Sequence, residues 1–205
     1  MRVVGHRVML TKAHMELMRI PRRFWEVSVD RIPESILDRV LSYVRDIDGN
    51  LDRGEGLLLW GKWGVGKTGA AVFIAMEARR RGATVLFSTA ESLRASVLEK
   101  TPFNATLSLM DRARLVDVLV IDDLGKEHPG ETGFTERLFE NLFRERSSAQ
   151  RTTFVTTNMD LNKMSERYKP SMLEVMKETV YPIQAKGESQ RDDTPGAIRE
   201  RLATG

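Results

Sequence analysis

The sequence predicts an α/β fold in which a parallel sheet of about five strands carries helices on both faces. Two observations lead to this prediction. Short, continuous apolar runs alternate along the chain with longer segments of helical spacing, which is the pattern of a parallel sheet buried on both sides. The first of these runs, GLLLW, leads directly into the glycine-rich segment GKWGVGKT at residues 61–68. Glycines crowded around one lysine are poor material for a core and indicate a loop that holds a ligand.

The chain before this loop contains a short arm and one amphipathic helix. Residues 1–19 form a short basic N-terminal arm with patchy helical spacing, followed by Pro21. Apolar residues then recur at helical spacing between 32 and 50, on a stripe formed by Ile36, Leu37, Val40, Leu41, Val44 and Ile47. Pro33 near the start and Gly49-Asn50 past the end predict the limits of this helix.

One domain is expected to span residues 20–191. A strand at 57–60 leads into the loop, and a helix follows to about Arg81, where Gly82 stops it. Further strands are predicted at 84–89, 116–125, 151–158 and 180–185, and further helices at 90–100, 131–147 and 161–179, the last broken near Pro170. The polar tail 192–205 is expected to be flexible.

Composition narrows the class of protein. The chain has 205 residues, of which 41% are hydrophobic and 30% charged, which is typical of a soluble globular domain. No stretch approaches the roughly 18 apolar residues of a membrane span, and the N-terminus lacks the apolar segment of a signal peptide. Without cysteine, disulfides and thiolate metal sites are excluded, and the three histidines are scattered singly. We therefore expect a cytoplasmic protein without membrane contact.

The charge distribution allows two interpretations. The net charge is +3, but residues 1–23 hold six basic residues against one acid, and Arg79, Arg80 and Arg81 close a predicted helix. These residues either form a solvated surface, with cations placed favourably at a helix C-terminus, or they contact nucleic acid.

The glycine-rich loop is expected to bind a nucleoside triphosphate, because it matches G-x-x-x-x-G-K-[ST] between a strand and a helix. Its glycines let backbone N–H groups turn around an anion, and the following helix adds the positive end of its dipole. Lys67 is expected to reach the β- and γ-phosphates, and the Thr68 hydroxyl to bind Mg²⁺. The predicted binding residues are Gly61, Lys62, Trp63, Gly64, Val65, Gly66, Lys67, Thr68 and Gly69. Trp63 either stacks on a ligand or partner or lies across the surface.

Polar residues end two other predicted strands. A carboxylate buried at Asp122 would be costly without a cation, so Mg²⁺ held between Thr68 and Asp122 is expected. Asp123 is then placed to polarise a water for attack on the γ-phosphate; the alternative for the pair is a turn or a helix cap. Asn158 either orients that water or caps a turn.

Together, GKWGVGKT, VLVIDDLG, TTFVTTN, SERY and GESQR resemble, in order and spacing, the motifs of AAA+ P-loop ATPases, and among them the DnaC/DnaI-type helicase loaders and their IstB-type transposition relatives. The likeness covers about residues 20–191. It implies a reduced or absent C-terminal helical lid, and in residues 20–34 a lead-in strand whose Ile20, Pro21 and Phe24 pack against adenine. The chain departs from such loaders in lacking the cysteines of a zinc-built helicase-binding module.

The resemblance also assigns roles to single residues. It implies Lys67 and Thr68 as the Walker A pair, Asp122 and Asp123 as the Walker B pair, and Asn158 as sensor 1. Arg191 becomes the sensor-2 arginine, and Arg167 a candidate arginine finger that acts on a neighbouring subunit. Relatives often carry a second arginine four residues further on, where this chain has Ser171.

Three functions remain open. The first is an ATPase that loads a replicative DNA helicase onto single-stranded DNA, slow by itself, stimulated by assembly or DNA, and encoded by a phage or mobile element. In it, homo-oligomers form on ATP or DNA, and Arg94, Lys100 or the arm contacts DNA phosphates. The second is an IstB-like ATPase helper of a DNA transposase. The third is a nucleotide-switched recruitment scaffold with little hydrolysis. ATP with Mg²⁺ is the expected ligand, although the loop itself does not exclude GTP.

Overall fold

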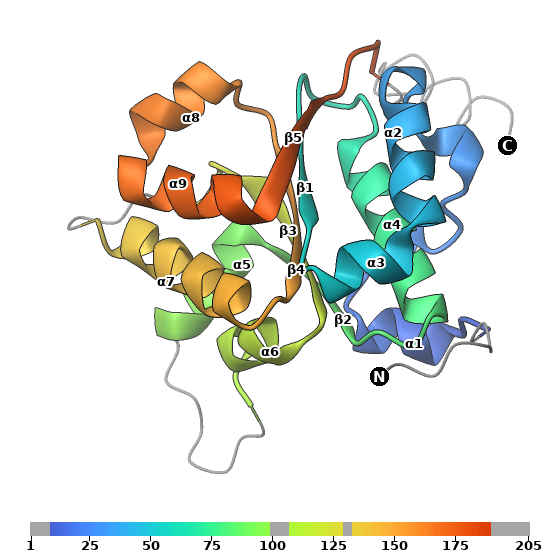
Figure 1. The fold of residues 1–205 in the computed structure, drawn as a ribbon, viewed down its shortest axis with the longest axis horizontal. Coiled ribbons are helices and arrows are strands. Elements are labelled where there is room, and N and C mark those ends of the chain that lie inside the picture. Colours follow the sequence, from blue (N-terminus) through green and yellow to red (C-terminus); the bar gives the residue numbers. More distant parts are fainter. Residues whose placement is uncertain (1–8, 99–106, 129–132, 190–205) are drawn as a thin grey trace, which may run out of the picture.

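The computed structural model describes residues 9–98, 107–128 and 133–189 (Figure 1). Its centre is a sheet of five parallel strands in the order β2-β3-β4-β1-β5. The strands are β1 (Gly56–Trp60), β2 (Val85–Thr89), β3 (Val118–Leu124), β4 (Thr152–Thr157) and β5 (Val180–Gln184). The predicted parallel sheet of about five strands is confirmed.

Two layers of helices cover the sheet, because alternate strand residues point to opposite faces. In β1, Leu57 and Leu59 join one buried cluster and Leu58 joins the other. The first face carries helices α1 (Lys12–Leu17), α2 (Glu34–Arg45), α3 (Ile47–Asp52) and α4 (Lys67–Arg80). The second carries α5 (Ala90–Leu98), α6 (Leu109–Leu115), α7 (Phe134–Ser148), α8 (Leu161–Arg167) and α9 (Pro170–Thr179), on the opposite side of the sheet in Figure 1.

The described part of the N-terminal arm is packed into the domain. Met15 and Met18 are buried in the same cluster as α4. The carbonyl oxygen of Met18 accepts a hydrogen bond of 2.8 Å from the backbone N–H of Phe87, in the edge strand β2. The arm thus covers a sheet edge that would otherwise present unpaired backbone groups.

The lead-in strand implied for residues 20–34 is wrong. This segment forms two 3-10 turns, Arg22–Phe24 and Val29–Arg31, instead of a strand. The indole N–H of Trp25 donates to the carbonyl oxygen of Ile20 over 2.7 Å, which closes the chain into a turn. As a result, Arg23 and Phe24 lie beside the glycine-rich loop.

Two helix predictions also need correction. The predicted stop at Gly49-Asn50 is wrong, since α2 ends at Arg45 and α3 runs through both residues to Asp52. Asn50 is buried there, and its side-chain amide donates to the carbonyl oxygen of Tyr43 over 2.9 Å. Helix α6 was not predicted, although Ser108 and Asp111 form a capping box at its start.

The other predicted bounds of helices and strands agree closely with the structure. The break near Pro170 is confirmed, because α8 ends at Arg167 and Pro170 is the first residue of α9. None of the described helices is long and apolar enough to cross a membrane. The expectations about a C-terminal lid and a flexible tail concern residues 190–205, which lie outside the described residues, as does Lys100.

Candidate functional site

The glycine-rich loop connects β1 to the N-terminus of α4, at the carboxyl edge of the sheet. Gly61, Gly64 and Gly66 have φ values of 144°, 77° and 96°, a region that other residues adopt only at a cost. A Cβ atom on Gly61 would also lie 2.2 Å from the carbonyl oxygen of Ala185, just past β5. The loop therefore requires glycine both for its conformation and for its packing against the neighbouring strand.

Lys67 brings the loop and the end of β4 together. Its side chain is buried, and Nζ donates to the carbonyl oxygens of Gly61 and Lys62 at 2.9 and 2.6 Å. The same ammonium donates to Oδ1 of Asn158 at 2.8 Å. One cation thus lies within reach of both the loop and the residue predicted to orient a water.

Asp122 and Thr68 form a second pair at this edge. The Thr68 hydroxyl donates to Oδ1 of Asp122 over 2.8 Å, and the Thr156 hydroxyl donates to the same oxygen over 2.5 Å. Burial raises the pKa of the Asp122 carboxyl, while the two hydroxyl groups counteract the shift. A buried carboxylate next to hydroxyl oxygens is a donor set that suits a hard divalent cation, so the residues fit the predicted Mg²⁺.

Asp123 faces the same site through an unusual backbone conformation. Its φ is 58°, and the pairing of β3 with β4 shifts register between Ile121 and Leu124. The backbone N–H of Asp123 donates to Oγ1 of Thr156 over 3.0 Å, and the side-chain amide of Asn158 donates to Oδ1 of Asp123 over 3.3 Å. Asp122, Asp123 and Asn158 thus form one continuous polar group at the strand ends.

These side chains line a hollow of about 430 Å³. The loop contributes Trp63, Gly64, Gly66, Lys67, Thr68 and Gly69, and the strand ends contribute Asp122, Asp123 and Asn158. Arg23, Phe24 and Lys126 complete the lining. Of the three residues expected to pack against adenine, Phe24 lines this hollow, whereas Ile20 is buried in the core.

Individual loop residues differ in what they can contribute. Val65 is buried, so its side chain belongs to the core. Trp63 is 62% exposed, and Nζ of Lys126 lies 4.3 Å from the centre of its ring. Trp63 therefore lies at the surface of the hollow and stacks on a cation of the same chain.

Of the two arginines predicted for the site, the described one, Arg167, does not line the hollow. Arg167 donates to the carbonyl oxygen of Glu127 over 2.8 Å, and its Nη2 lies 3.6 Å from the buried carboxylate of the same residue. Arg191 lies outside the described residues. Ser189, the last described residue, reaches the loop: a Cβ on Gly64 would lie 2.0 Å from its hydroxyl oxygen.

Three of the arginines considered for DNA contact, Arg80, Arg81 and Arg94, form ion pairs within the chain. Arg94 pairs with Glu91 at 2.7 Å. In the run that ends α4, Arg80 pairs with Glu77 and Arg81 with Asp48. These pairs favour the interpretation of a solvated surface for that run.

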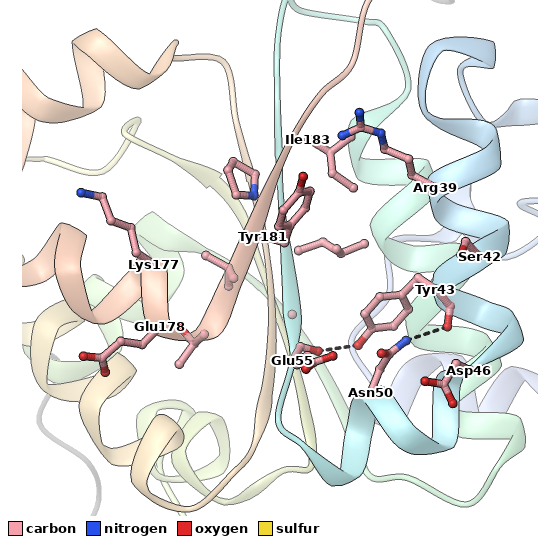
Figure 2. Close-up of a pocket in the computed structure, with 15 residues that line it drawn as sticks. Arg39, Ser42, Tyr43, Asp46, Asn50, Glu55, Lys177, Glu178, Tyr181 and Ile183 are labelled. Carbon is pink, nitrogen blue, oxygen red and sulfur yellow. Dashed lines mark hydrogen bonds between the residues drawn. The ribbon is translucent and has the colours of Figure 1, made fainter.

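A larger hollow of about 870 Å³ lies at the opposite end of the strands (Figure 2). It follows the free side of β5 between α2 and α9, and Gly56 and Val180, the first residues of β1 and β5, line it. Figure 2 shows two hydrogen bonds in it: the Tyr43 hydroxyl donates to the carbonyl oxygen of Glu55 over 2.5 Å, and the Asn50 amide donates to the carbonyl oxygen of Tyr43 over 2.9 Å. The lining has two basic residues, Arg39 and Lys177, against three acidic ones, Asp46, Glu55 and Glu178. This hollow therefore has no excess of the cations that would bind a triphosphate.

Sequence reasoning missed three residues of the site. Thr156 contacts both aspartates, but as a threonine inside a strand it reads as an ordinary β-former. Arg23 follows Arg22 in a short 3-10 helix and Lys126 lies in a turn after β3, and only the fold brings these two residues to the loop. The one signal in the sequence was the position of Lys126, three residues after Asp123 in a segment rich in turn residues.

The fold and the site define the class of protein. A parallel sheet with a G-x-x-x-x-G-K-T loop before α4, and with Asp122 and Asn158 at neighbouring strand ends, is a P-loop NTPase of the AAA+ type. The chain belongs to the family of IstB-like ATP-binding proteins, whose model matches residues 30–193. A comparison with curated proteins finds no match.

Solved structures share the fold at low sequence identity. The DnaC helicase loader is 22% identical, with a TM-score of 0.67, over 81% of this chain and 100% of that chain. DnaI is 23% identical, with a TM-score of 0.71, over 88% of this chain and 100% of that chain. The replication initiator DnaA bound to AMPPCP and single-stranded DNA is 17% identical, with a TM-score of 0.63, over 88% of this chain and 55% of that chain.

Proposed function

We propose that the protein is a cytoplasmic ATPase that loads a replicative DNA helicase onto single-stranded DNA. The convergence of Lys67, Thr68, Asp122 and Asn158 on one hollow is the observation that carries the ATPase assignment. Membership of an ATP-binding family supports the nucleotide. The loader assignment draws on the similarity in fold to DnaC and DnaI.

In this proposal each residue has a chemical task. Lys67 and the N-terminus of α4 bind the β- and γ-phosphates, and Thr68 with Asp122 holds Mg²⁺, which neutralises phosphate charge when bound. Asp123 accepts the proton of the attacking water, and Asn158 orients that water.

The proposal gives Arg167 and Arg191 the tasks that the family resemblance implies. Arg191 contacts the γ-phosphate from the C-terminal segment, and Arg167 acts on the nucleotide of a neighbouring subunit. In the single chain Arg167 is held by Glu127, so assembly has to redirect it. Hydrolysis is therefore slow in the isolated chain and faster in a homo-oligomer on DNA.

Two substitutions test the ATPase. Lys67→Ala should abolish ATP binding, measured by equilibrium dialysis, and Asp123→Asn should retain binding but lose turnover. Lys177→Ala, an exposed lysine at the opposite end of the sheet, is the matched control and should leave both unchanged. If Lys67→Ala binds ATP as tightly as the parent, the assignment of the loop is wrong. If Asp123→Asn hydrolyses ATP normally, the protein is a nucleotide-switched scaffold instead.

A second experiment tests the loader. Purified chain and the cognate replicative helicase should form a complex with ATP that size-exclusion chromatography resolves. Retention of labelled single-stranded DNA should require ATP and weaken between about 50 and about 200 mM salt. If neither the helicase complex nor the ATP-dependent retention of DNA is observed, the loader proposal is wrong, whereas the ATPase proposal is unaffected.

The family match favours a second candidate, an IstB-like ATPase helper of a DNA transposase. Its ATP site would be the same, so only the partners separate the two. A preference for duplex over single-stranded DNA, measured with the same oligonucleotide in both forms, would favour the transposase helper.

A further inference from the structure

A turn with an anchored backbone carries Lys126 back over the candidate site. The backbone N–H of Lys126 donates to the carbonyl oxygen of Asp123 over 3.1 Å. Gly125, with a φ of 99°, permits the reversal. The buried carboxylate of Glu127 accepts hydrogen bonds from the Gly125 N–H at 2.7 Å and from the Tyr168 hydroxyl at 2.5 Å. The backbone on both sides of Lys126 is thus fixed, and its side chain has a defined origin beside Asp123.

The Lys126 ammonium joins the two halves of the site. Nζ lies 2.7 Å from Oδ2 of Asp123, and 4.3 Å from the centre of the Trp63 ring in the glycine-rich loop. An ammonium over an indole face is held by the ring quadrupole. Lys126 therefore lies between the loop expected to bind phosphates and the carboxylate expected to act as the base.

In this arrangement both oxygens of Asp123 have partners. Oδ2 accepts from Lys126, and Oδ1 faces the side-chain amide of Asn158 at 3.3 Å. A carboxylate oxygen that accepts a hydrogen bond from an ammonium cannot at the same time accept a proton from water along that direction. The Lys126 contact therefore competes with the task proposed for Asp123.

The ion pair between Lys126 and Asp123 can exchange partners at little cost. Its side chains are 39% and 34% exposed, and ion pairs of this exposure contribute little to folding stability. A stable fold does not depend on it. The terminal phosphate of ATP carries more negative charge than one carboxylate, and a phosphate in the same hollow offers the ammonium a stronger partner.

We propose that Lys126 senses the terminal phosphate: it pairs with Asp123 when ATP is not bound, and transfers to the γ-phosphate, guided by the Trp63 ring, when ATP binds. The transfer frees Oδ2 of Asp123 to face the attacking water. Nothing in the motif pattern assigns this task to Lys126, and it rests on the proposed ATPase function. Because ADP has no γ-phosphate, Lys126 then distinguishes ATP from ADP.

The test compares both nucleotides in the full chain and three variants. Lys126→Met keeps the length of the side chain and removes its charge, Lys126→Arg keeps the charge, and Trp63→Leu removes the ring. Lys177→Met is the control for loss of an exposed lysine elsewhere. For each protein, the Kd of ATP and of ADP is measured by equilibrium dialysis, and kcat and KM by phosphate release. Far-ultraviolet circular dichroism verifies that each variant is folded.

For Lys126→Met we expect the Kd and KM of ATP to rise about tenfold, with kcat changed by less than about twofold, because the contact is made already in the bound ground state. The Kd of ADP should stay within about twofold of the parent. Lys126→Arg should restore ATP affinity, and Trp63→Leu should weaken ATP more than ADP. In the parent, ATP should change Trp63 emission, defined by comparison with Trp63→Phe, and ADP should not.

Several results would overturn the inference. Equal losses for ATP and ADP in Lys126→Met would mean that Lys126 only supports the loop, and unchanged affinities would mean that the pair is a surface contact. A fall in kcat with unchanged KM would mean that Lys126 acts on Asp123 alone. Failure of the proposed function is distinguishable, because a parent chain that binds no ATP shows it before any variant is made.

Discussion

Asp122 provides the sharpest test of the site, because function and stability should oppose each other there. Its carboxylate is buried and carries two hydroxyl donors, from Thr68 and Thr156. Burial raises its pKa, so the ionised form destabilises the fold unless a cation is bound. Asp122→Asn keeps the shape and an oxygen acceptor but removes the charge. We expect the variant, measured without nucleotide at neutral pH, to be more stable than the parent.

The expected gain in stability is small, because the hydroxyl groups compensate part of the cost of burying the charge. The cost of burying the charge is largely offset by the two hydroxyl groups, which leaves about 1 kcal/mol in favour of asparagine. For a chain of this size that corresponds to a rise in Tm of about 2–4 °C. The effect has a pH dependence of defined sign. Since the folded state holds the Asp122 proton more tightly than the unfolded state, the parent loses stability as pH rises through the raised pKa. The advantage of asparagine should vanish in acid below the ordinary aspartate value of 3.8.

The same variant should lose its response to nucleotide. At about 100 times Kd, ATP with Mg²⁺ stabilises the parent by about 2.7 kcal/mol, or roughly 5–10 °C in Tm. Asp122→Asn should lose most of this shift, because one of its two proposed Mg²⁺ ligands is weakened. Differential scanning fluorimetry with and without nucleotide measures both effects, and Asp48→Asn on the surface is the control. A variant that is less stable than the parent, yet keeps the full ATP shift, would refute the reasoning.

Three further predictions concern the scaffold around the site. Gly61→Ala should cost about 2–4 kcal/mol in urea unfolding, because its Cβ would meet the Ala185 carbonyl oxygen at 2.2 Å; Gly82→Ala, which meets nothing within 4 Å, should cost only about 1 kcal/mol. Arg146→Met should cost about 3 kcal/mol, since five hydrogen bonds from the buried guanidinium to α6, β4 and their neighbours are lost; a loss below about 1 kcal/mol would contradict this. The Arg94 guanidinium and, to a smaller extent, the His128 backbone N–H lower the pKa of Glu91 to about 2. The ionised Glu91 carboxylate therefore stabilises the fold fully above its ordinary pKa of 4.5, and this stabilisation disappears as pH falls towards 2. The stabilities of the parent and Glu91→Gln, measured by unfolding at several pH values, should converge in acid, and a constant difference between them would contradict the prediction.

The sequence was most informative where chemistry and fold coincide. Continuous apolar runs predict buried parallel strands, and parallel strands bring their carboxyl ends to one edge. That rule alone predicts that Lys67, Asp122 and Asn158 meet, and the structure brings them together. The glycine-rich loop is equally easy to predict from sequence, because few other structures need several glycines around one lysine.

What could not be predicted depends on tertiary contacts between single residues. Helix α3 continues through Gly49-Asn50 because the Asn50 side chain is buried and donates to the Tyr43 carbonyl, which overrides its usual role as a helix stop. The contact of Lys126 with Trp63 joins two turns 63 positions apart in the sequence. The spacing of apolar residues does not predict this contact, because the position of a turn depends on the helices and strands that it connects.

The Asp-Asp pair shows how a local irregularity creates function. In a regular strand, consecutive side chains point to opposite faces, so Asp122 and Asp123 could not both face one hollow. The register shift and the φ of 58° at Asp123 turn the second carboxylate back towards the first. A left-handed aspartate costs about 1–2 kcal/mol. Thr156 offsets this cost, because its one hydroxyl accepts the Asp123 N–H and donates to the Asp122 carboxylate. The threonine that motif reasoning passed over is therefore the residue that makes two adjacent acids into one site.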